Sequence, residues 1–268
     1  MDKFIKELTE AFDGIRSPSE IFHFSLTDST NERARRYPNE LLADSCAKIS
    51  GEGGVSLFVA DCQSQGRGRL NRRFVSNANA GLYMSIKFPY REELSRAVGI
   101  TPLAAVAVCR AIEGLCEAKP KIKWVNDIYL GEKKLSGILT ESTVKEDGTR
   151  EFICGIGVNL TPSDMPSEVA EIATDLLTEG YSVSRAALCA KITEEFLSGI
   201  DKMWSKEFIE EYKRRSFVIG RSVVVHCAGE EYSATATAVT DNYELLVSLP
   251  DGTERRLSAG EVSIKSKP

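Results

Sequence analysis

The stretch from Gln63 to Phe74 combines arginines with glycines in a way that suits the binding of an anion. It reads Gln-Ser-Gln-Gly-Arg-Gly-Arg-Leu-Asn-Arg-Arg-Phe and follows an apolar stretch, Val55–Ala60, that predicts a buried strand. Glycine lets the backbone approach a ligand closely, and a guanidinium matches phosphate or carboxylate oxygens two at a time. Because the chain is acidic overall, with a formal net charge of −5, the loop predicts a site for one specific anion.

Lysines recur in two later motifs. In the first, Lys121 and Lys123 share one face of a predicted strand, and Asn126 and Asp127 follow where the strand should turn. Taken alone, this pattern is more typical of an ordinary edge strand with a turn. The second motif places Lys134 at the start of the next predicted strand. We expect the hairpin to bring Asp127 and Lys134 together, so that a carboxylate can hold the lysine in position.

A third motif, Gly155-Ile-Gly157-Val-Asn159, alternates glycine with aliphatic residues on a predicted strand. One face of such a strand is bare, which allows a flat ring or another backbone to approach. The motif lacks the third glycine and the following helix of a dinucleotide-binding fingerprint, so we reject a Rossmann interpretation. Asn159 could read an adenine edge, although asparagine is also common where a strand ends.

Composition narrows the class of protein. The 268 residues are 42% hydrophobic and 27% charged, which is ordinary for a globular protein. Seven scattered cysteines without a C-x-x-C pair favour thiols in a reducing cytosol over disulfides or zinc. The charged N-terminus lacks a signal core, and the best apolar run, Ile100–Cys109, is too short to span a membrane. We expect a cytoplasmic protein that binds no membrane. Only two histidines occur, both in strand-like runs, so an enzyme here should act through lysine, arginine and bound phosphate.

Periodicity predicts an α+β fold in which helices pack against a mixed sheet. Helices are expected at the N-terminus to near Gly14, after the capping residues 27–31 towards Ala43, over Leu103–Cys116, and along Ser184–Arg215. Short strands with turns at 228–229, 241–242 and 251–252 then predict a small β-barrel behind a boundary near Phe217. The predicted domains are residues 1–216 and 217–268.

Five motifs, taken in order, resemble those of the biotin protein ligases, also called biotin–[acetyl-CoA-carboxylase] ligases. They are Ser-Thr-Asn at 29–31, Gln-x-x-Gly-Arg-Gly-Arg from 63, Lys-Trp-x-Asn-Asp from 123, Lys-Leu-Ser-Gly from 134 and Gly-Ile-Gly-Val-Asn from 155. The C-terminal β module resembles that family's SH3-like domain. The resemblance implies a biotin/lipoate ligase-like catalytic domain that activates biotin with MgATP to biotinyl-5′-AMP. Biotin then passes to a lysine of a biotin carboxyl carrier protein domain of acetyl-CoA carboxylase or a related carboxylase.

The resemblance also implies roles for individual residues. Expected to bind biotin are Ser29, Thr30, Asn31, Gln63, Gly66, Arg67 and Lys134. Expected to bind ATP or the adenylate are Arg67, Gly68, Arg69, Arg72, Phe74, Asn126, Lys134 and Asn159. The catalytic set is Lys134, Arg69, Lys123 and Asp127, with Asn126 or Asp127 as a ligand of Mg²⁺.

The sequence departs from the family pattern at three positions. Val125 replaces a frequent proline, Asn71 a frequent glycine, and Phe74 a tryptophan that packs on adenine.

About 20 residues precede the first catalytic strand, too few for a helix-turn-helix domain, so we expect no sequence-specific DNA binding. Monomer and homodimer both stay open. The rival interpretations are a lipoate or octanoate ligase of related fold and a non-enzymatic RNA-binding module, which the acidic charge disfavours.

Overall fold

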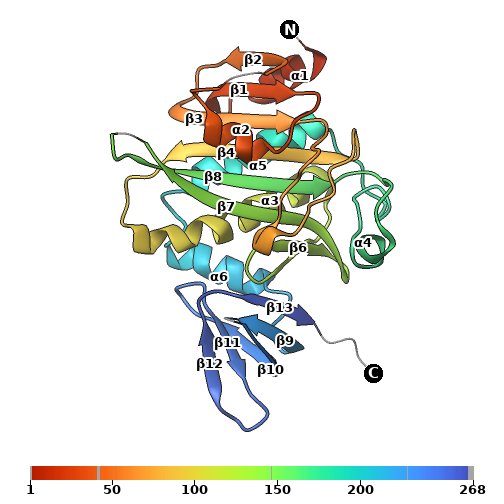
Figure 1. Ribbon diagram of the computed structural model, residues 1–268, viewed down its shortest axis with the longest axis vertical. Coiled ribbons are helices and arrows are strands. Elements are labelled where there is room, and N and C mark those ends of the chain that lie inside the picture. The colour runs from red at the N-terminus through yellow and green to blue at the C-terminus, as the bar shows by residue number, and fades with distance from the viewer. Residues whose placement is uncertain (1, 41–42, 146, 228, 265–268) are drawn as a thin grey trace.

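An eight-stranded mixed sheet forms the centre of the larger part of the protein (Figure 1). The computed structural model describes residues 2–40, 43–145, 147–227 and 229–264. The strand order is β2-β1-β3-β4-β8-β7-β6-β5, with β1 and β3 parallel and the other neighbours antiparallel. The strands are β1 (Pro18–Phe24), β2 (Ser45–Lys48), β3 (Glu52–Ala60), β4 (Gly81–Pro89), β5 (Lys121–Lys123), β6 (Asp127–Leu130), β7 (Lys133–Val144) and β8 (Arg150–Asn159).

Long helices cover one face of this sheet. The alanine-rich α3 (Ile100–Cys116) is buried along most of its length and packs on α5 (Arg185–Gly199), while α1 (Lys3–Ala11) packs on the outer side of α5. The predicted helical stretch up to Arg215 divides into two, because a turn separates α5 from α6 (Lys206–Arg215) and Ser205 caps the second helix by accepting from Phe208 N.

One helical run contradicts the expectation that no segment reaches membrane-spanning length. Helix η2 (Leu94–Gly99) continues into α3, and the joined 23 residues are long and apolar enough by length and composition. Within its most apolar window 67% of residues are buried inside the fold. A helix that is buried in the core is apolar around most of its surface, and this explains the composition of the run.

Helix α2 (Thr30–Arg36) lies on the opposite face, over a small second core formed by Phe22, Phe58 and neighbouring side chains. The prediction that this helix continues towards Ala43 is wrong. Tyr37 already has an extended backbone, with ψ of 137°, because the ring of a following proline, here Pro38, disfavours helical geometry in the residue before it. The short helices η1 (Arg69–Asn71) and α4 (Ser167–Ile172) lie in the loops on the same side as α2.

The C-terminal part is a separate five-stranded antiparallel sheet, drawn in blue in Figure 1. Its order is β12-β11-β10-β9-β13, and this strand pairing gives an open sheet. The turns predicted at 241–242 and 251–252 are confirmed, whereas Ala228 lies outside the described residues. Trp124 Nε1 donates to Tyr243 O at 2.8 Å and thereby ties this sheet to the larger part. The strands are β9 (Ser222–Cys227), β10 (Glu230–Val239), β11 (Leu245–Ser248), β12 (Glu254–Leu257) and β13 (Glu261–Ile264).

Candidate active site

The sequence motifs meet in one cavity of about 270 Å³ on the α2 side of the sheet. Its wall contains every residue for which the resemblance implies a binding or catalytic role except Gly66. Gly66 lies at the base of the loop instead, where Phe74 N donates to its carbonyl at 2.8 Å and a Cβ would lie 2.6 Å from Ser76 Oγ. These residues therefore line one cavity, with Gly66 as a structural support beside it.

One end of the cavity is polar and uncharged. Gln63 Oε1 accepts from Thr30 N at 2.8 Å and from Thr30 Oγ1 at 3.2 Å, while Gln63 Nε2 donates to Ser76 Oγ at 2.9 Å. The Asn31 amide donates to Glu141 and accepts from Ser85, so its orientation is fixed as well. Ser29 is buried beside them, and as the N-cap residue it makes no side-chain cap hydrogen bond. The hydroxyls of Ser29 and of Ser136, which is buried without a hydrogen-bond partner among the described residues, both line the cavity and can bind a ligand atom.

The Gln63–Phe74 loop folds back on itself beside this end. Gly68 N donates to Arg72 O at 2.7 Å, and the turn between them requires a left-handed conformation at Leu70, with φ of 54°. Asn71 replaces a frequent glycine, and asparagine tolerates a positive φ, but the left-handed residue of this loop is Leu70 and not Asn71. Leu70 is 69% exposed, so this loop tip carries an apolar side chain next to the mouth of the cavity.

The arginines of the loop diverge. Arg67 contacts Glu32 of α2 and Glu141 of β7. Arg69 donates to Asn126 Oδ1 and to Gly260 O, both at 2.9 Å. Arg72 Nη1 lies 2.5 Å from Glu261 Oε1 at the start of β13. Two of these arginines therefore reach the C-terminal sheet.

The cationic end of the cavity is built by the β5–β6–β7 hairpins. The predicted pairing of Asp127 with Lys134 is confirmed, with Nζ 2.7 Å from Oδ1. Asn126 Nδ2 donates to Asp127 Oδ1 at 3.1 Å and so places the carboxylate. Lys123 stands opposite Asp127 in the β5–β6 register and is only 8% exposed. Burial lowers the pKa of Lys123, and the charge of Asp127 counteracts part of that shift.

An aromatic ring covers the bare strand that the Gly155–Asn159 motif predicts. A Cβ on Gly157 would lie 2.5 Å from the Phe74 ring, and one on Gly137 would lie 3.4 Å from it. Glycine at both positions lets Phe74 pack flat against β7 and β8. Asn159 Nδ2 donates to Thr174 O at 2.9 Å, which fixes the amide at the edge of the cavity.

Sequence reasoning missed the carboxylates of this site. Glu32, Glu141 and Glu261 each pair with a loop arginine, and no local motif marks them. The apolar wall from α4, with Val169 and Ile172, was missed as well. Only the excess of acidic over basic residues in the composition hinted that the arginines would be paired.

Comparison with known proteins assigns the fold. The biotin/lipoate A/B protein ligase family matches residues 26–159, half of the chain. The chain belongs to this family. The matched region begins just before Ser29 and ends at Asn159, so it contains all the motifs of the cavity described above.

Three ligases illustrate the similarity. The "Bifunctional ligase/repressor BirA" of Bacillus subtilis is 41% identical over 140 residues, which are 51% of this chain and 43% of that protein, so the chain matches less than half of that relative's length. The "Biotin--[acetyl-CoA-carboxylase] ligase" of Mycobacterium tuberculosis is 29% identical over 233 residues, 83% of each chain. Among solved structures, a biotin protein ligase from Aquifex aeolicus in complex with biotin and ATP has a TM-score of 0.70 and 25% identity. That match covers 92% of this chain and 99% of the other.

Proposed function

We propose that this protein is a biotin protein ligase, a biotin–[acetyl-CoA-carboxylase] ligase that activates biotin with ATP and transfers it to a lysine of a carrier protein. The observation that carries the proposal is one cavity with a neutral polar end at Ser29 and Gln63 and a cationic end at Lys123 and Lys134. Biotin has the same division, with a ureido ring at one end and a carboxylate at the other. The named activity of the Mycobacterium ligase and the ligands of the Aquifex structure support it.

At the polar end, the fixed amides of Asn31 and Gln63 and the hydroxyls of Ser29 and Thr30 present donors and acceptors without charge. A ureido group has both two N–H donors and a carbonyl acceptor, so a site of this kind can satisfy it completely. A lipoyl dithiolane ring has no such groups, so it could not pair with the Ser29 hydroxyl or use the remaining hydrogen-bonding capacity of Gln63. This difference favours biotin over lipoate within the family.

At the cationic end, two anions have to meet. One oxygen of the biotin carboxylate attacks the α-phosphorus of ATP, the bond to the bridging oxygen breaks, and pyrophosphate leaves. Lys134, with Lys123 and the loop arginines Arg69 and Arg72, offsets the repulsion between the anions and stabilises the charge of the transition state. In the second step the carrier lysine amine attacks the carbonyl carbon of biotinyl-5′-AMP, and AMP leaves. We assign Phe74 and Asn159 to contacts with the adenine in both steps.

Mg²⁺ enters this proposal as the counter-ion of ATP. The structure places Asn126 and Asp127 at the cationic end, yet their oxygens already accept from Arg69 and Lys134. Groups of three or more His, Cys, Asp or Glu side chains suited to a metal do not occur in the part of the chain that the structure describes. This donor set fits a Mg²⁺ ion that keeps water and phosphate ligands and takes at most one carboxylate, Asp127, from the protein.

The domain division, the protein partner and the cellular location belong to the same proposal. We propose that residues 1–216 form the catalytic domain and that residues 217–268, with their five-stranded sheet, form an SH3-like module. The carrier domain of a biotin-dependent carboxylase is the proposed protein partner. The free cysteines support a site of action in a reducing cytosol. Only the ligase activity of the Bacillus protein is proposed here, because the match covers 43% of its length.

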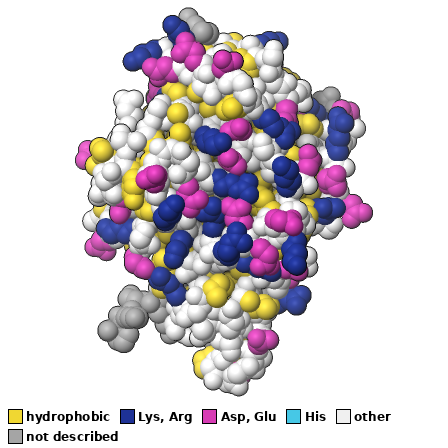
Figure 2. Space-filling model, turned by 180° about the vertical axis from the view of Figure 1, so that it is seen from behind, with side chains coloured by type: hydrophobic (Ala, Val, Ile, Leu, Met, Phe, Trp, Pro, Cys, Tyr) yellow, Lys and Arg dark blue, Asp and Glu magenta, His cyan; other side chains and the backbone are white. Residues whose placement is uncertain are grey.

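An RNA-binding role finds little support. On the face shown in Figure 2, lysine and arginine side chains alternate with aspartate and glutamate. Two of the four arginines of the Gln63–Phe74 loop, Arg67 and Arg72, are themselves paired with carboxylates. A non-specific nucleic-acid binder presents a surface of one sign instead.

The experiment that tests the function is ATP–pyrophosphate exchange with biotin and lipoate side by side, followed by incubation with MgATP, biotin and a biotin carrier domain. We expect exchange that depends on biotin, and biotin on a single carrier lysine. Exchange with lipoate but not with biotin would overturn the proposal in favour of the lipoate ligases.

A further inference from the structure

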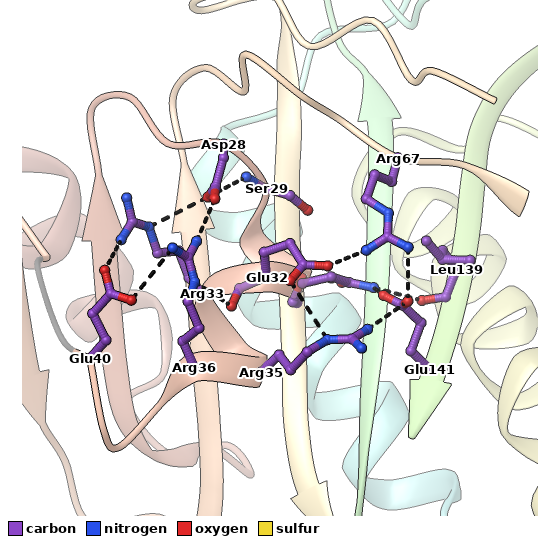
Figure 3. Close-up of polar contacts among 12 residues, drawn as sticks. Asp28, Ser29, Glu32, Arg33, Arg35, Arg36, Glu40, Arg67, Leu139 and Glu141 are labelled. Carbon is purple, nitrogen blue, oxygen red and sulfur yellow. Dashed lines mark hydrogen bonds and ion pairs between the residues drawn. The ribbon is translucent and has the colours of Figure 1, made fainter. Parts of the chain in front are cut away.

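Arg67, the first arginine of the Gln63–Phe74 loop, lies in a ring of four charged side chains (Figure 3). Its guanidinium contacts Glu32 of α2, and its Nη2 lies 3.4 Å from Glu141 Oε1 of β7. Arg35 closes the ring, with Nη2 2.7 Å from Glu141 Oε1 and Nε 3.7 Å from Glu32 Oε2. We call Glu32, Arg35, Arg67 and Glu141 the clasp. It joins the loop to one helix and one strand.

Glu141 also connects the clasp to the floor of the cavity. Its second oxygen accepts from Asn31 Nδ2 at 2.8 Å, and Asn31 is 3% exposed. On its other side the Asn31 amide accepts from Ser85 Oγ at 2.6 Å. A single carboxylate therefore holds a loop arginine and orients a buried amide of the polar end.

The clasp is one of several contacts that fasten this loop. Near its start, Ser64 N donates to Thr27 O and Gln65 N to Asp28 O. Near its end, Arg69 donates to Asn126 and Gly260, and Arg72 pairs with Glu261. The clasp holds the segment between them. Isolated exposed ion pairs contribute little, but here Glu141 is 16% exposed and shares its charge among three partners. Partly buried networks of this kind are worth more than single surface pairs.

We propose that Glu32 and Glu141 are positioning residues that hold the Gln63–Phe74 loop closed over the cavity and thereby set the rate at which its ligand escapes. The identity of that ligand, biotin, rests on the function proposed above, whereas the closure of the loop does not. Neither glutamate needs to touch biotin, because Glu32 acts through Arg67, and Glu141 through Arg67 and Asn31.

Hydrogen exchange measured by mass spectrometry on peptides covering 64–74 tests the closure without any ligand. Exchange should rise about tenfold in Glu141→Gln and about threefold in Glu32→Gln, the scale of a lost charge-assisted bond and of a weaker exposed pair. Glu40→Gln is the matched control, because Glu40 pairs with Arg33 and Arg36 on the far side of α2 and leaves the loop alone. Peptides of β11 and β12, at the opposite edge of the C-terminal sheet from β13, serve as an internal reference.

A second pair of variants shows whether Arg67 carries the effect. In an Arg67→Gln background, Glu32→Gln should add nothing to loop exchange, since its partner is already gone. An equal increase in both backgrounds would mean that Glu32 acts through the helix, and it would overturn the proposal. Loop exchange within twofold of the unmodified protein in both glutamate variants would overturn it as well.

Biotin release then tests the consequence of closure. The dissociation rate of biotin should rise about threefold in Glu32→Gln, where the contacts of Asn31 are kept, and about tenfold in Glu141→Gln, while the association rate changes less, as is usual for interface changes. Faster loop exchange without faster release would overturn the proposed control of ligand escape. If the unmodified protein binds no biotin at all, the proposed function falls, and the exchange experiment still decides whether the clasp holds the loop.

Discussion

Lys123 is the charged group of the site that the fold accommodates least well, and its replacement should stabilise the protein while abolishing activity. Its side chain is 8% exposed, and among the described residues no carboxylate oxygen lies within 4.0 Å of its ammonium. Asp127, its partner in register, is committed to Lys134 at 2.7 Å. Burial of the ammonium lowers the pKa of Lys123. A buried cation without a close partner destabilises the folded state.

The substitution Lys123→Met removes the charge and keeps an unbranched chain of similar length. Replacing buried charges with apolar groups of similar volume is often neutral or stabilising by about 1–4 kcal/mol. Against this stands the Tyr129 ring, whose centroid lies 5.5 Å from the ammonium, a contact worth about 0.5–1 kcal/mol. We therefore expect a net gain in the free energy of unfolding of about 1–2 kcal/mol, which corresponds to a melting temperature higher by about 2–6 °C. Exchange activity should fall by at least about 100-fold, the effect of removing one preorganised charge-stabilising group.

The pH dependence of this gain has a definite sign. Because the pKa of Lys123 is lower in the folded protein than in the unfolded chain, the unfolded chain binds more protons in the window between the two values. The free energy of unfolding of the unmodified protein, relative to the variant, therefore rises with pH through that window. The advantage of Lys123→Met should be greatest below the lowered folded pKa and should disappear as the pH reaches the ordinary value of a lysine.

Denaturant titration at several pH values, run beside ATP–pyrophosphate exchange, measures both effects. The matched control is Lys121→Met on the same strand, because Lys121 is exposed; its stability and activity should stay near those of the unmodified protein. A Lys123→Met variant that is less stable than the unmodified protein, with Lys121→Met unchanged, would refute the argument that this ammonium is poorly compensated. Retained exchange activity would refute its place in the site.

Further predictions concern the rest of the site. Lys134→Ala should collapse adenylate formation while biotin binding stays measurable by calorimetry; unchanged exchange kinetics would remove this lysine from the mechanism. Trypsin should cut the Gln63–Phe74 loop more slowly once biotin or the adenylate is bound, and equal cutting rates would count against a loop that closes on its ligand. Gly155→Ala should destabilise the fold by about 1–3 kcal/mol, because its Cβ would lie 2.9 Å from Asn31 Cγ. As a contrast, Gly114→Ala meets open space on an exposed helix position and should stabilise by about 0.5–1 kcal/mol, both read from thermal unfolding.

The parts of this protein that sequence reasoning predicted depend on local order. The Asp127–Lys134 pair follows from a hairpin of fixed length, since strand register then decides which side chains are neighbours. The buried helix over Leu103–Cys116 follows from its composition, and the structure adds the first turn of α3 and the short helix η2 before it. The motifs of the cavity lie at the ends of strands and on the loops between them, where polar side chains can face a site.

The parts that escaped prediction depend on contacts between distant segments. Arg72 meets Glu261, a residue 189 positions later in the chain, and no periodicity could single out that glutamate. Glu32 lies on a helix surface, where unpaired glutamates are as common as paired ones. Pro38 predicts the end of α2, because a proline disfavours helical geometry in the residue before it. The capping and helix-forming residues that precede it favoured a longer helix.

The missed carboxylates explain how an acidic chain can gather so many cations in one cavity. Arg67 is balanced by Glu32 and Glu141, Arg72 by Glu261, and Lys134 by Asp127, so the like charges need not repel one another across a partly dehydrated space. Each of these partners is a carboxylate, the same chemical group as the acid of biotin and an analogue of a phosphate oxygen. An anionic substrate therefore competes for cations that are already oriented. Among the described residues no carboxylate oxygen lies within 4.0 Å of Lys123, Arg69 or Arg73, and of these three cavity cations Lys123 is the buried one. This is why we expect the largest conflict between stability and activity at that one position.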